Sequence, residues 1–213
     1  MVKNTPPSSK ESYISGNKLS FAENSTSKNV SMMMMNEKIK TVLVTTHLSL
    51  RNAIKKLSIE GELNAIQQAF EWMNRIGIKD PKIGVSALNP HAGEDGQFGD
   101  EENKIIIPAI NIAKSKGINA LGPIPADTIF MKAREGVYDI VVAQYHDQGL
   151  IPIKYLGLDN GVNVTIGLDF IRTSPDHGTA YDIAGNGIAN HKSFHRAASY
   201  AQDLIKLWDR YHK

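Results

Sequence analysis

Three of the seven histidines lie where their imidazoles could bind a single metal ion. Each follows a β-branched, apolar run that predicts a strand: His47 follows residues 39–46, His91 follows 82–88 and His146 follows 139–143. If these strands are neighbours in one sheet, the rings can converge at its carboxyl edge. Neutral imidazole binds zinc and other divalent ions, and three protein ligands leave a position for a substrate oxygen. The pattern indicates a catalytic metal site, and the alternative is three unrelated polar loop residues.

Other polar residues near the histidines could support such a site. Residues 89–99 read NPHAGEDGQFG, a glycine-rich loop that either brings backbone N–H groups close to a ligand or is a plain solvent loop. Asp127 and Asp147 could orient histidines by bonding to the second ring nitrogen. They could equally be helix caps or turn residues.

The elements that would position these residues alternate between strands and helices. Strands are predicted at residues 39–46, 82–88, 139–143 and 161–168, and Met32 to Met35 predicts a buried strand or a helix start. Helices are predicted at residues 50–57, 100–116 and 193–208, the second of these with a kink at Pro108. A further helix is predicted to begin after Ser58, its N-cap, and to end at Gly77. The last helix is expected to turn these residues inward: Phe194, Ala197, Ala201, Leu204 and Trp208. This alternation predicts an α/β fold with a mixed, largely parallel sheet flanked by helices.

Composition narrows the class of protein. The chain has 213 residues, of which 41% are hydrophobic and 22% charged, as in ordinary globular proteins. The net charge of +2 and the absence of a basic run argue against nucleic acid as a partner. No apolar stretch in the sequence is long enough to span a bilayer, no signal-peptide core is apparent, and there is no cysteine. We therefore expect a cytoplasmic protein without membrane contact.

Several segments resemble, in order and spacing, the PdxA family of 4-hydroxythreonine-4-phosphate dehydrogenases. They are TTHLSL (45–50), NPHAGE (89–94), GPIPADT (122–128), YHDQGL (145–150), KYLG (154–157), GVNVTIGL (161–168) and FIRTSPDHGTAYDIAG (170–185). The resemblance runs from about Val30 to the C-terminus. It implies oxidation and decarboxylation of 4-hydroxythreonine 4-phosphate in pyridoxal phosphate biosynthesis, with NAD and a divalent metal (zinc, magnesium or cobalt). It also implies the architecture of isocitrate and isopropylmalate dehydrogenases.

The resemblance also implies roles for individual residues. His47, His91 and His146 match the metal ligands, while Lys154, Asn163 and Arg172 match positions that bind the phosphorylated four-carbon hydroxy acid. The stretch 177–190 is similar to a nucleotide-binding segment, with the cofactor-binding residues His177, Gly178, Asp182 and Asn190. Family members are homodimers in which one metal histidine crosses between subunits, and by position this would be His146. Two of these residues have alternative interpretations. Lys154 could be a solvated surface residue, and Arg172 could pair with Asp176.

The N-terminal region departs from the family pattern. Residues 1–30 form a polar leader before the catalytic α/β region at 31–213, and the family's His-Thr-Glu motif is not found there. We therefore expect a fold that lacks part of the first domain and an activity that is weak or absent. The alternatives are a D-threonate or D-erythronate 4-phosphate dehydrogenase, or a catalytically impaired, metal-binding dimeric remnant. The sequence argues against an acyl or phosphoryl hydrolase, since it has neither a GxSxG elbow nor a P-loop.

Overall fold

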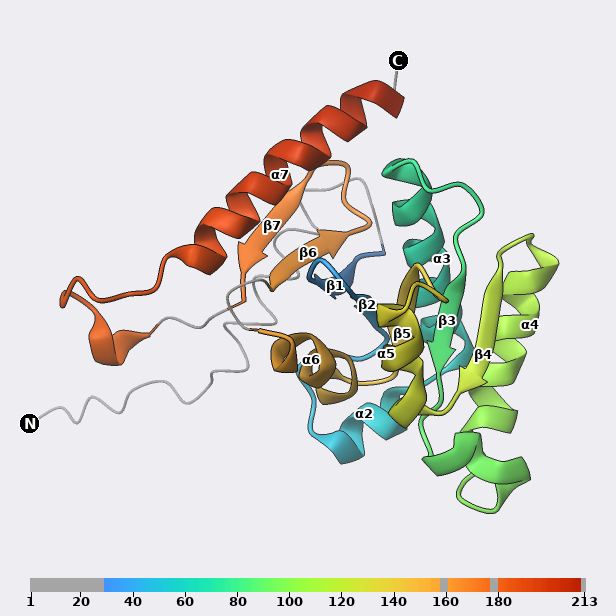
Figure 1. Cartoon of the computed structure of the whole chain (residues 1–213). Coiled ribbons are helices and arrows are strands. Elements are labelled where there is room, and N and C mark those ends of the chain that lie inside the picture. Colours follow the sequence, from blue (N-terminus) through green and yellow to red (C-terminus); the bar gives the residue numbers. More distant parts are fainter. Residues whose placement is uncertain (1–28, 158–160, 177–179, 212–213) are drawn as a thin grey trace, which may run out of the picture.

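A seven-stranded mixed sheet forms the centre of the computed structural model, which describes residues 29–157, 161–176 and 180–211 (Figure 1). The strands are β1 (Ser31–Met35), β2 (Lys40–Leu43), β3 (Ile83–Ser86), β4 (Ala120–Ile124), β5 (Ile140–Ala143), β6 (Val162–Ile166) and β7 (Arg172–Pro175). The helices are α2 (Leu50–Lys56), α3 (Ile59–Arg75), α4 (Ile107–Ser115), α5 (Ala126–Arg134), α6 (His146–Tyr155) and α7 (Lys192–Tyr211). The shorter helical segments are η1 (Pro90–Gly96), η2 (Glu102–Ile106) and η4 (Tyr181–Ile183).

The strand order β4-β3-β5-β2-β1-β6-β7 divides the sheet into two parts. Strands β4, β3, β5 and β2 run parallel to one another, so their carboxyl ends share one edge. Strands β1, β6 and β7 continue the sheet in antiparallel pairs. The predicted α/β class and mixed sheet are confirmed, and the parallel part contains the three strands that precede the histidines.

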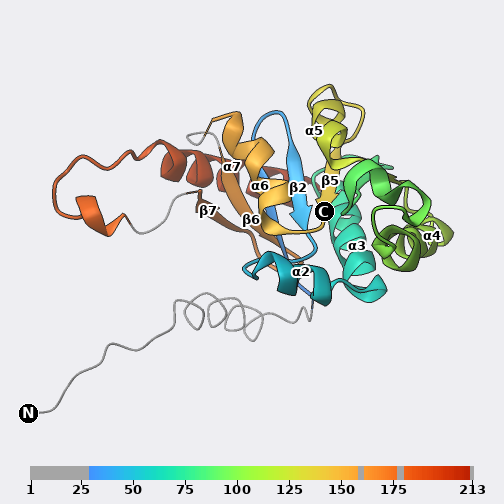
Figure 2. The same cartoon turned by 90° about the horizontal axis from the view of Figure 1, so that it is seen from below.

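Helices cover both faces of this sheet (Figure 2). Helices α3, α4 and α7 pack on one face, around a core that includes Met33, Ile66 and Val164. Helices α5 and α6 pack on the other face, around a core that includes Met34 and Ile153. Met33 and Met34 are fully buried on opposite faces of β1, as expected for consecutive residues of a strand. Of the two readings of the methionine run, the buried strand is therefore confirmed.

The start and end of α3 are those the sequence predicts. The Ser58 hydroxyl accepts a hydrogen bond from the Gly61 backbone N–H at 3.1 Å and so caps the helix. Gly77 follows the last turn with a φ of 91°, a conformation that glycine adopts without strain. This helix lies along the sheet behind the parallel strands and carries a buried glutamate, Glu62, to their carboxyl edge.

Several predicted elements need correction. The helix expected at residues 100–116 is a π-helical turn, η2, followed by α4, because Pro108 has no N–H for the regular hydrogen-bond ladder. Phe194 is 61% exposed, so its predicted inward direction is wrong; Ser193, Ala197 and Leu204 form the buried face of α7. Four elements were not predicted: β4, β7, α5 and α6. Both unpredicted strands contain proline, and α6 contains Gly149 and Pro152, residues typical of loops.

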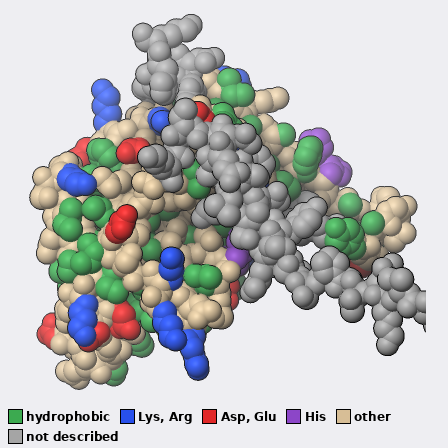
Figure 3. All heavy atoms as spheres, turned by 180° about the vertical axis from the view of Figure 1, so that it is seen from behind, with side chains coloured by type: hydrophobic (Ala, Val, Ile, Leu, Met, Phe, Trp, Pro, Cys, Tyr) green, Lys and Arg blue, Asp and Glu red, His purple; other side chains and the backbone are tan. Residues whose placement is uncertain are grey.

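The distribution of charged side chains on the surface agrees with the small net charge of the chain, +2. Basic and acidic side chains are interspersed on the face seen in Figure 3. Among the described residues, no helix has the length and apolar character needed to cross a bilayer.

Candidate functional site

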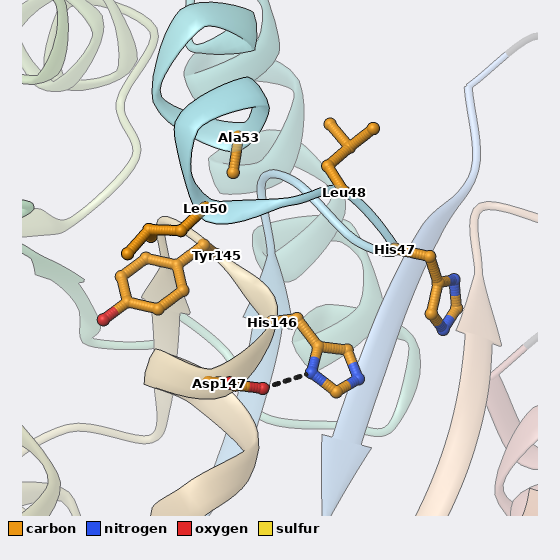
Figure 4. Close-up of a pocket in the computed structure, with 7 residues that line it drawn as sticks. All are labelled: His47, Leu48, Leu50, Ala53, Tyr145, His146 and Asp147. Atoms are coloured by element: carbon orange, nitrogen blue, oxygen red, sulfur yellow. Dashed lines mark hydrogen bonds and ion pairs between the residues drawn. The ribbon is translucent and has the colours of Figure 1, made fainter.

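His47 and His146 line one pocket at the carboxyl edge of the parallel strands (Figure 4). Their ring centroids lie 5.5 Å apart and the ring planes are inclined by 47°. The cavity has a volume of about 210 Å³ and is lined by His47, Leu48, Leu50, Ala53, Tyr145, His146 and Asp147. Two of the three predicted metal ligands, His47 after β2 and His146 after β5, thus lie together.

The local backbone explains why the two rings meet. Parallel pairing continues beyond the two strands, since the Val44 N–H donates to the Ala143 carbonyl at 2.9 Å and the Thr45 N–H donates to the Gln144 carbonyl at 3.2 Å. His47 follows this paired segment, and His146 opens α6 directly after it. The shared register therefore delivers both side chains to the same edge.

Asp147 contacts the His146 ring. Its Oδ1 atom lies 2.7 Å from His146 Nδ1, which leaves Nε2 as the ring nitrogen turned away from the aspartate (Figure 4). A carboxylate in this position fixes the ring and favours the tautomer with a proton on Nδ1. Asp127 lies exposed in the first turn of α5, and in the described part of the chain no hydrogen bond joins it to a histidine. The two aspartates, which the sequence does not separate, therefore differ in their contacts.

His91 lies outside this pocket. It is exposed on η1, where its ring centroid is 6.0 Å from that of Phe98. Within residues 29–157, 161–176 and 180–211, no three histidine or carboxylate side chains come together as a set that could hold an ion. The donor chemistry of His47 and His146 suits a divalent metal, but a complete site needs at least one ligand from elsewhere.

A buried carboxylate fixes the loop that carries His91. Residues 91–95 all have positive φ, a conformation that is uncommon outside glycine and needs support from the surrounding structure. Glu102 anchors the start of this loop, since its Oε1 accepts from the backbone N–H groups of Leu88 and Asn89 at 2.8 and 2.7 Å. Its Oε2 accepts from the Asn89 side chain at 2.9 Å. The sequence does not single out Glu102, because an acid near a helix start is favourable in any case and hydrogen bonding across 14 positions leaves no local signal.

The predicted substrate-binding residues gather around α6 and the antiparallel strands. Asn163 on β6 lies opposite Met34, and so belongs to the α6 side of the sheet. Its Oδ1 atom is buried and has no hydrogen-bond partner among the described residues. Arg172 on β7 lies opposite Thr165, two residues along β6 and therefore on the same side. Lys154 comes from α6 itself.

Both cations make specific contacts. Lys154 Nζ lies 2.7 Å from Asp176 Oδ1, and the Asp176 side chain is only 7% exposed. Lys154 is therefore not the freely solvated lysine of the alternative reading. Arg172 Nη1 donates to Thr165 Oγ1 at 2.6 Å, and partial burial lowers the pKa of its guanidinium, which nevertheless stays charged. The Asp176 carboxylate bonds Lys154, whereas the alternative reading had assigned it to Arg172.

The predicted cofactor residues are only partly visible. His177 and Gly178 lie outside the described residues. Asp182 is exposed on η4, and Asn190 is exposed just before α7, where its Oδ1 accepts from the Lys192 backbone N–H at 3.0 Å. The structure therefore gives these two residues accessible positions on the segment that links β7 to α7.

A buried polar network behind the pocket was not predicted. The Gln144 side-chain amide donates to the Ser86 carbonyl at 2.8 Å and to Glu62 Oε1 at 3.2 Å. The Gln144 carbonyl accepts from the Thr45 hydroxyl at 2.8 Å. Gln148 extends the network, accepting from the Gln144 N–H at 2.7 Å and donating to the Ala87 carbonyl at 2.8 Å. One network thus connects the ends of β2, β3 and β5, the strands that lead to His47, His91 and His146.

Comparison with known sequences gives a consistent assignment. Residues 6–201 match the family model described as pyridoxal phosphate biosynthetic protein PdxA. A 4-hydroxythreonine-4-phosphate dehydrogenase of Beijerinckia indica is 56% identical over 184 residues, which cover 86% of this chain and 55% of the relative. A D-threonate 4-phosphate dehydrogenase of Pectobacterium atrosepticum is 46% identical over 184 residues, covering 86% and 56%. The chain therefore spans about half the length of the curated relatives it matches.

Solved structures agree with the sequence comparison. The 4-hydroxythreonine-4-phosphate dehydrogenase of Klebsiella pneumoniae superposes with a TM-score of 0.84 at 43% identity, over 90% of this chain and 60% of that one. Isocitrate dehydrogenase of Methylococcus capsulatus shares the fold, with a TM-score of 0.57 at 18% identity, over 98% of this chain and 66% of that one. The predicted likeness to the isocitrate dehydrogenase architecture is confirmed. Because residues 6–201 of this chain match the family model and a relative is 56% identical over 86% of the chain, the chain belongs to the PdxA family.

Proposed function

We propose that the chain carries the metal- and phosphate-binding part of an NAD-dependent dehydrogenase that oxidises and decarboxylates 4-hydroxythreonine 4-phosphate. The observation that carries this proposal is the His47–His146 pair, whose rings share one pocket at the carboxyl edge of the sheet. Family membership and the name of the Beijerinckia indica relative support the substrate class. The pair supplies imidazole nitrogens, which bind zinc and cobalt well and magnesium less strongly.

His47 and His146 would hold the metal together with His91. When bound, a divalent ion supplies Lewis-acid polarisation of the substrate oxygen and stabilises the negative charge that develops there. Asp147 fixes the orientation of His146, so that its Nε2 atom is available to the ion. Because His91 lies outside the pocket, we propose a homodimer in which one of the three histidines comes from the neighbouring subunit. The family resemblance assigns that role to His146, and the in-chain contact of His146 with His47 makes His91 the second candidate.

Lys154, Asn163 and Arg172 would bind the substrate. Lys154 provides a point charge for the phosphate dianion, and Arg172 provides a planar fork of N–H donors. Asn163 has a buried amide oxygen without a partner among the described residues, so it can accept a hydrogen bond from a substrate hydroxyl. Asp176 holds Lys154 in place before the substrate arrives. These residues orient the carbon that carries the hydroxyl group toward the cofactor.

NAD, when bound, would accept the hydride from that carbon, and the hydroxyl proton would pass to water. The product is a β-keto acid, which loses carbon dioxide when the electrons of the breaking bond pass to the ketone oxygen. We propose that the stretch 177–190, with His177, Gly178, Asp182 and Asn190, contacts the nucleotide. The support for this role is the resemblance of the segment to the nucleotide-binding stretch of isocitrate and isopropylmalate dehydrogenases.

A D-threonate or D-erythronate 4-phosphate dehydrogenase is the second candidate function. The Pectobacterium atrosepticum relative named for D-threonate 4-phosphate supports it. Both substrate classes present a phosphate and a secondary alcohol, so the same cations and the same histidines would serve either one. The rate of NADH formation on each substrate, measured side by side, separates the two candidates.

The dehydrogenase proposal is tested by NADH formation with 4-hydroxythreonine 4-phosphate and each divalent metal. We expect an activity that is weak relative to that of the longer relatives, depends on added metal and is abolished by the double substitution His47→Ala/His146→Ala. His195→Ala is the control, because His195 is an exposed histidine on α7, away from the pocket. Metal-dependent NADH formation that survives the loss of both pocket histidines would refute the assignment of the site.

A further inference from the structure

Glu62 is a buried carboxyl group that the proposed reaction does not use. Its side chain is fully buried at the start of α3, behind the histidine pocket. The one hydrogen bond of this side chain among the described residues is to the Gln144 amide, whose Nε2 donates to Glu62 Oε1 at 3.2 Å. A carboxylate in such a place would have a large desolvation cost with little to offset it.

The orientation of the Gln144 amide is fixed by its neighbours. Its Nε2 lies between two acceptors, Glu62 Oε1 and the Ser86 carbonyl, so the reverse orientation would place three oxygen atoms together. The remaining oxygen of each group, Glu62 Oε2 and Gln144 Oε1, is buried without a partner among the described residues. The Glu62 and Gln144 side chains already share one hydrogen bond, and each has one unsatisfied acceptor oxygen. A single hydrogen between these two oxygens would satisfy both.

Among the residues that the structure describes, no positive group offsets a negative charge at this position. The titratable side chains on elements packed against α3, within the described residues, are Lys40, Glu102, Lys104, Lys114, Lys192, His195, Arg196, Tyr200, Asp203 and Lys206. None of them changes the pKa of the Glu62 carboxyl group. Burial has the larger effect on this pKa, and the hydrogen bond from Gln144 has the smaller, opposite effect. Burial raises the pKa of Glu62 to about 8. The neutral acid is therefore the favoured form near neutral pH.

We infer that Glu62 is a protonated carboxylic acid whose O–H donates to Gln144 Oε1, forming a neutral acid–amide pair that fastens the strand ends below the histidine pocket. The proton satisfies both orphaned oxygens at once. The pair then holds Gln144, whose backbone and side chain bond Thr45 of the β2 end and Ser86 of β3. Glu62 is on this account a positioning residue, acting through Gln144 on the segments that carry His47 and His146. The link to metal binding rests on the proposed function, whereas the protonated pair does not.

The pair is tested by comparing wild type with Glu62→Gln in unfolding experiments across pH. The glutamine side chain can make the same two hydrogen bonds without a titratable proton. A group with a raised folded pKa stabilises fully below its unfolded pKa and loses that contribution as pH rises through the folded value. We therefore expect the unfolding constant of wild type, relative to Glu62→Gln, to rise about tenfold per pH unit between the unfolded value of 4.5 and about 8. Glu60→Gln, an exposed neighbour on the same helix, should keep the wild-type pH dependence.

Infrared difference spectroscopy of the folded wild-type protein gives an independent readout. At neutral pH we expect the carbonyl stretch of a protonated carboxylic acid, absent from Glu62→Gln. A ratio of unfolding constants that does not change with pH, together with no such band, would overturn the protonated pair.

The positioning role is tested with zinc alone as the probe, at constant pH. We expect Glu62→Ala to bind zinc at least tenfold more weakly than wild type and Glu62→Gln to restore wild-type binding. Equal zinc affinity of wild type and Glu62→Ala would overturn the positioning role. If wild type itself binds no zinc, the proposed function fails and with it the positioning role, while the infrared and unfolding results still decide the protonated pair.

Discussion

His47 and His146 place their ring centroids 5.5 Å apart although they follow different strands, β2 and β5. The two strands are parallel neighbours, and backbone pairing continues beyond both of them to Thr45 and Gln144. The closeness of the rings is therefore a consequence of strand order and register. The same arrangement leaves His91, which follows β3 through a longer loop, outside the pocket.

Asp147→Asn should weaken zinc binding by about tenfold, the lower end of the usual effect of removing a carboxylate that orients a histidine ligand. The lower end applies because the Asp147 side chain is 71% exposed. Asp127→Asn is the matched control, since this exposed aspartate opens α5 without a hydrogen bond to a histidine in the described part of the chain. Calorimetry with zinc measures both variants. Equal losses in the two would contradict the orienting role of Asp147.

Glu102→Ala should lower the free energy of unfolding by about 3 kcal/mol, because it removes the acceptor of two backbone N–H groups and one side-chain amide. The neighbouring Glu101→Ala should cost less than about 1 kcal/mol, since Glu101 accepts only from the Asn89 side chain among the described residues. Urea unfolding measures both values. A Glu102→Ala protein as stable as Glu101→Ala would show that the loop carrying His91 does not depend on this carboxylate.

Arg172→Lys should raise the KM for the phosphorylated substrate about tenfold, with a smaller effect on kcat. Lysine keeps the charge but loses the planar fork, and a charge-assisted hydrogen bond contributes about 1.5–3 kcal/mol. Lys114→Arg on the exposed side of α4 is a control for exchanging the two cations. Steady-state kinetics with 4-hydroxythreonine 4-phosphate measure the effect, and an unchanged KM would exclude Arg172 from phosphate binding.

Tyr200→Phe should remove part of the loss of stability at alkaline pH. Burial, assisted by Asp203, raises the pKa of Tyr200 from 10 to about 12. The stabilising contribution is complete below pH 10 and disappears as pH rises through about 12. Wild type should therefore lose stability more steeply than Tyr200→Phe between these values, by up to about 1.4 kcal/mol per pH unit. Parallel slopes in urea unfolding at several pH values would contradict the burial of this hydroxyl.

Mixed dimers of single-histidine variants should identify the ligand that crosses between subunits. If His146 crosses, His47→Ala mixed with His146→Ala regains complete sites, because one subunit keeps His47 and His91 and the other supplies His146. If His91 crosses, His47→Ala mixed with His91→Ala regains them, and the first mixture does not. Zinc content after unfolding and refolding the mixtures provides the readout. Recovery in neither mixture would contradict a site shared between subunits.

Much of the fold follows from local patterns in the sequence. Ser58 and Gly77 mark the ends of α3, and the apolar runs mark β2, β3 and β5, because capping and strand propensity act over a few residues. The helix α6 was missed since Gly149 and Pro152 resemble loop residues. At Gly149, however, an added Cβ would lie 2.5 Å from Leu43 Cδ2, so the close packing of α6 on β2 requires glycine. This is a tertiary constraint that no local pattern reveals.

The site was predictable to a similar extent. Histidines after strands indicated a shared edge, and the structure brings two of them together. The buried network of Glu62, Gln144 and Gln148 could not be predicted, because its members are polar residues far apart in the sequence whose burial depends on one another. Glutamate at a helix start is ordinarily a favourable surface residue, and only the assembled sheet shows that Glu62 is enclosed.

Zinc calorimetry on three proteins tests the central claim most directly: wild type, His47→Ala/His146→Ala and His191→Ala/His195→Ala. The last is a matched control, since His191 and His195 form another exposed pair, with ring centroids 5.1 Å apart. We predict that wild type and the control bind zinc alike and that the pocket variant loses this binding. Zinc binding that persists without His47 and His146 but disappears without His191 and His195 would contradict the account.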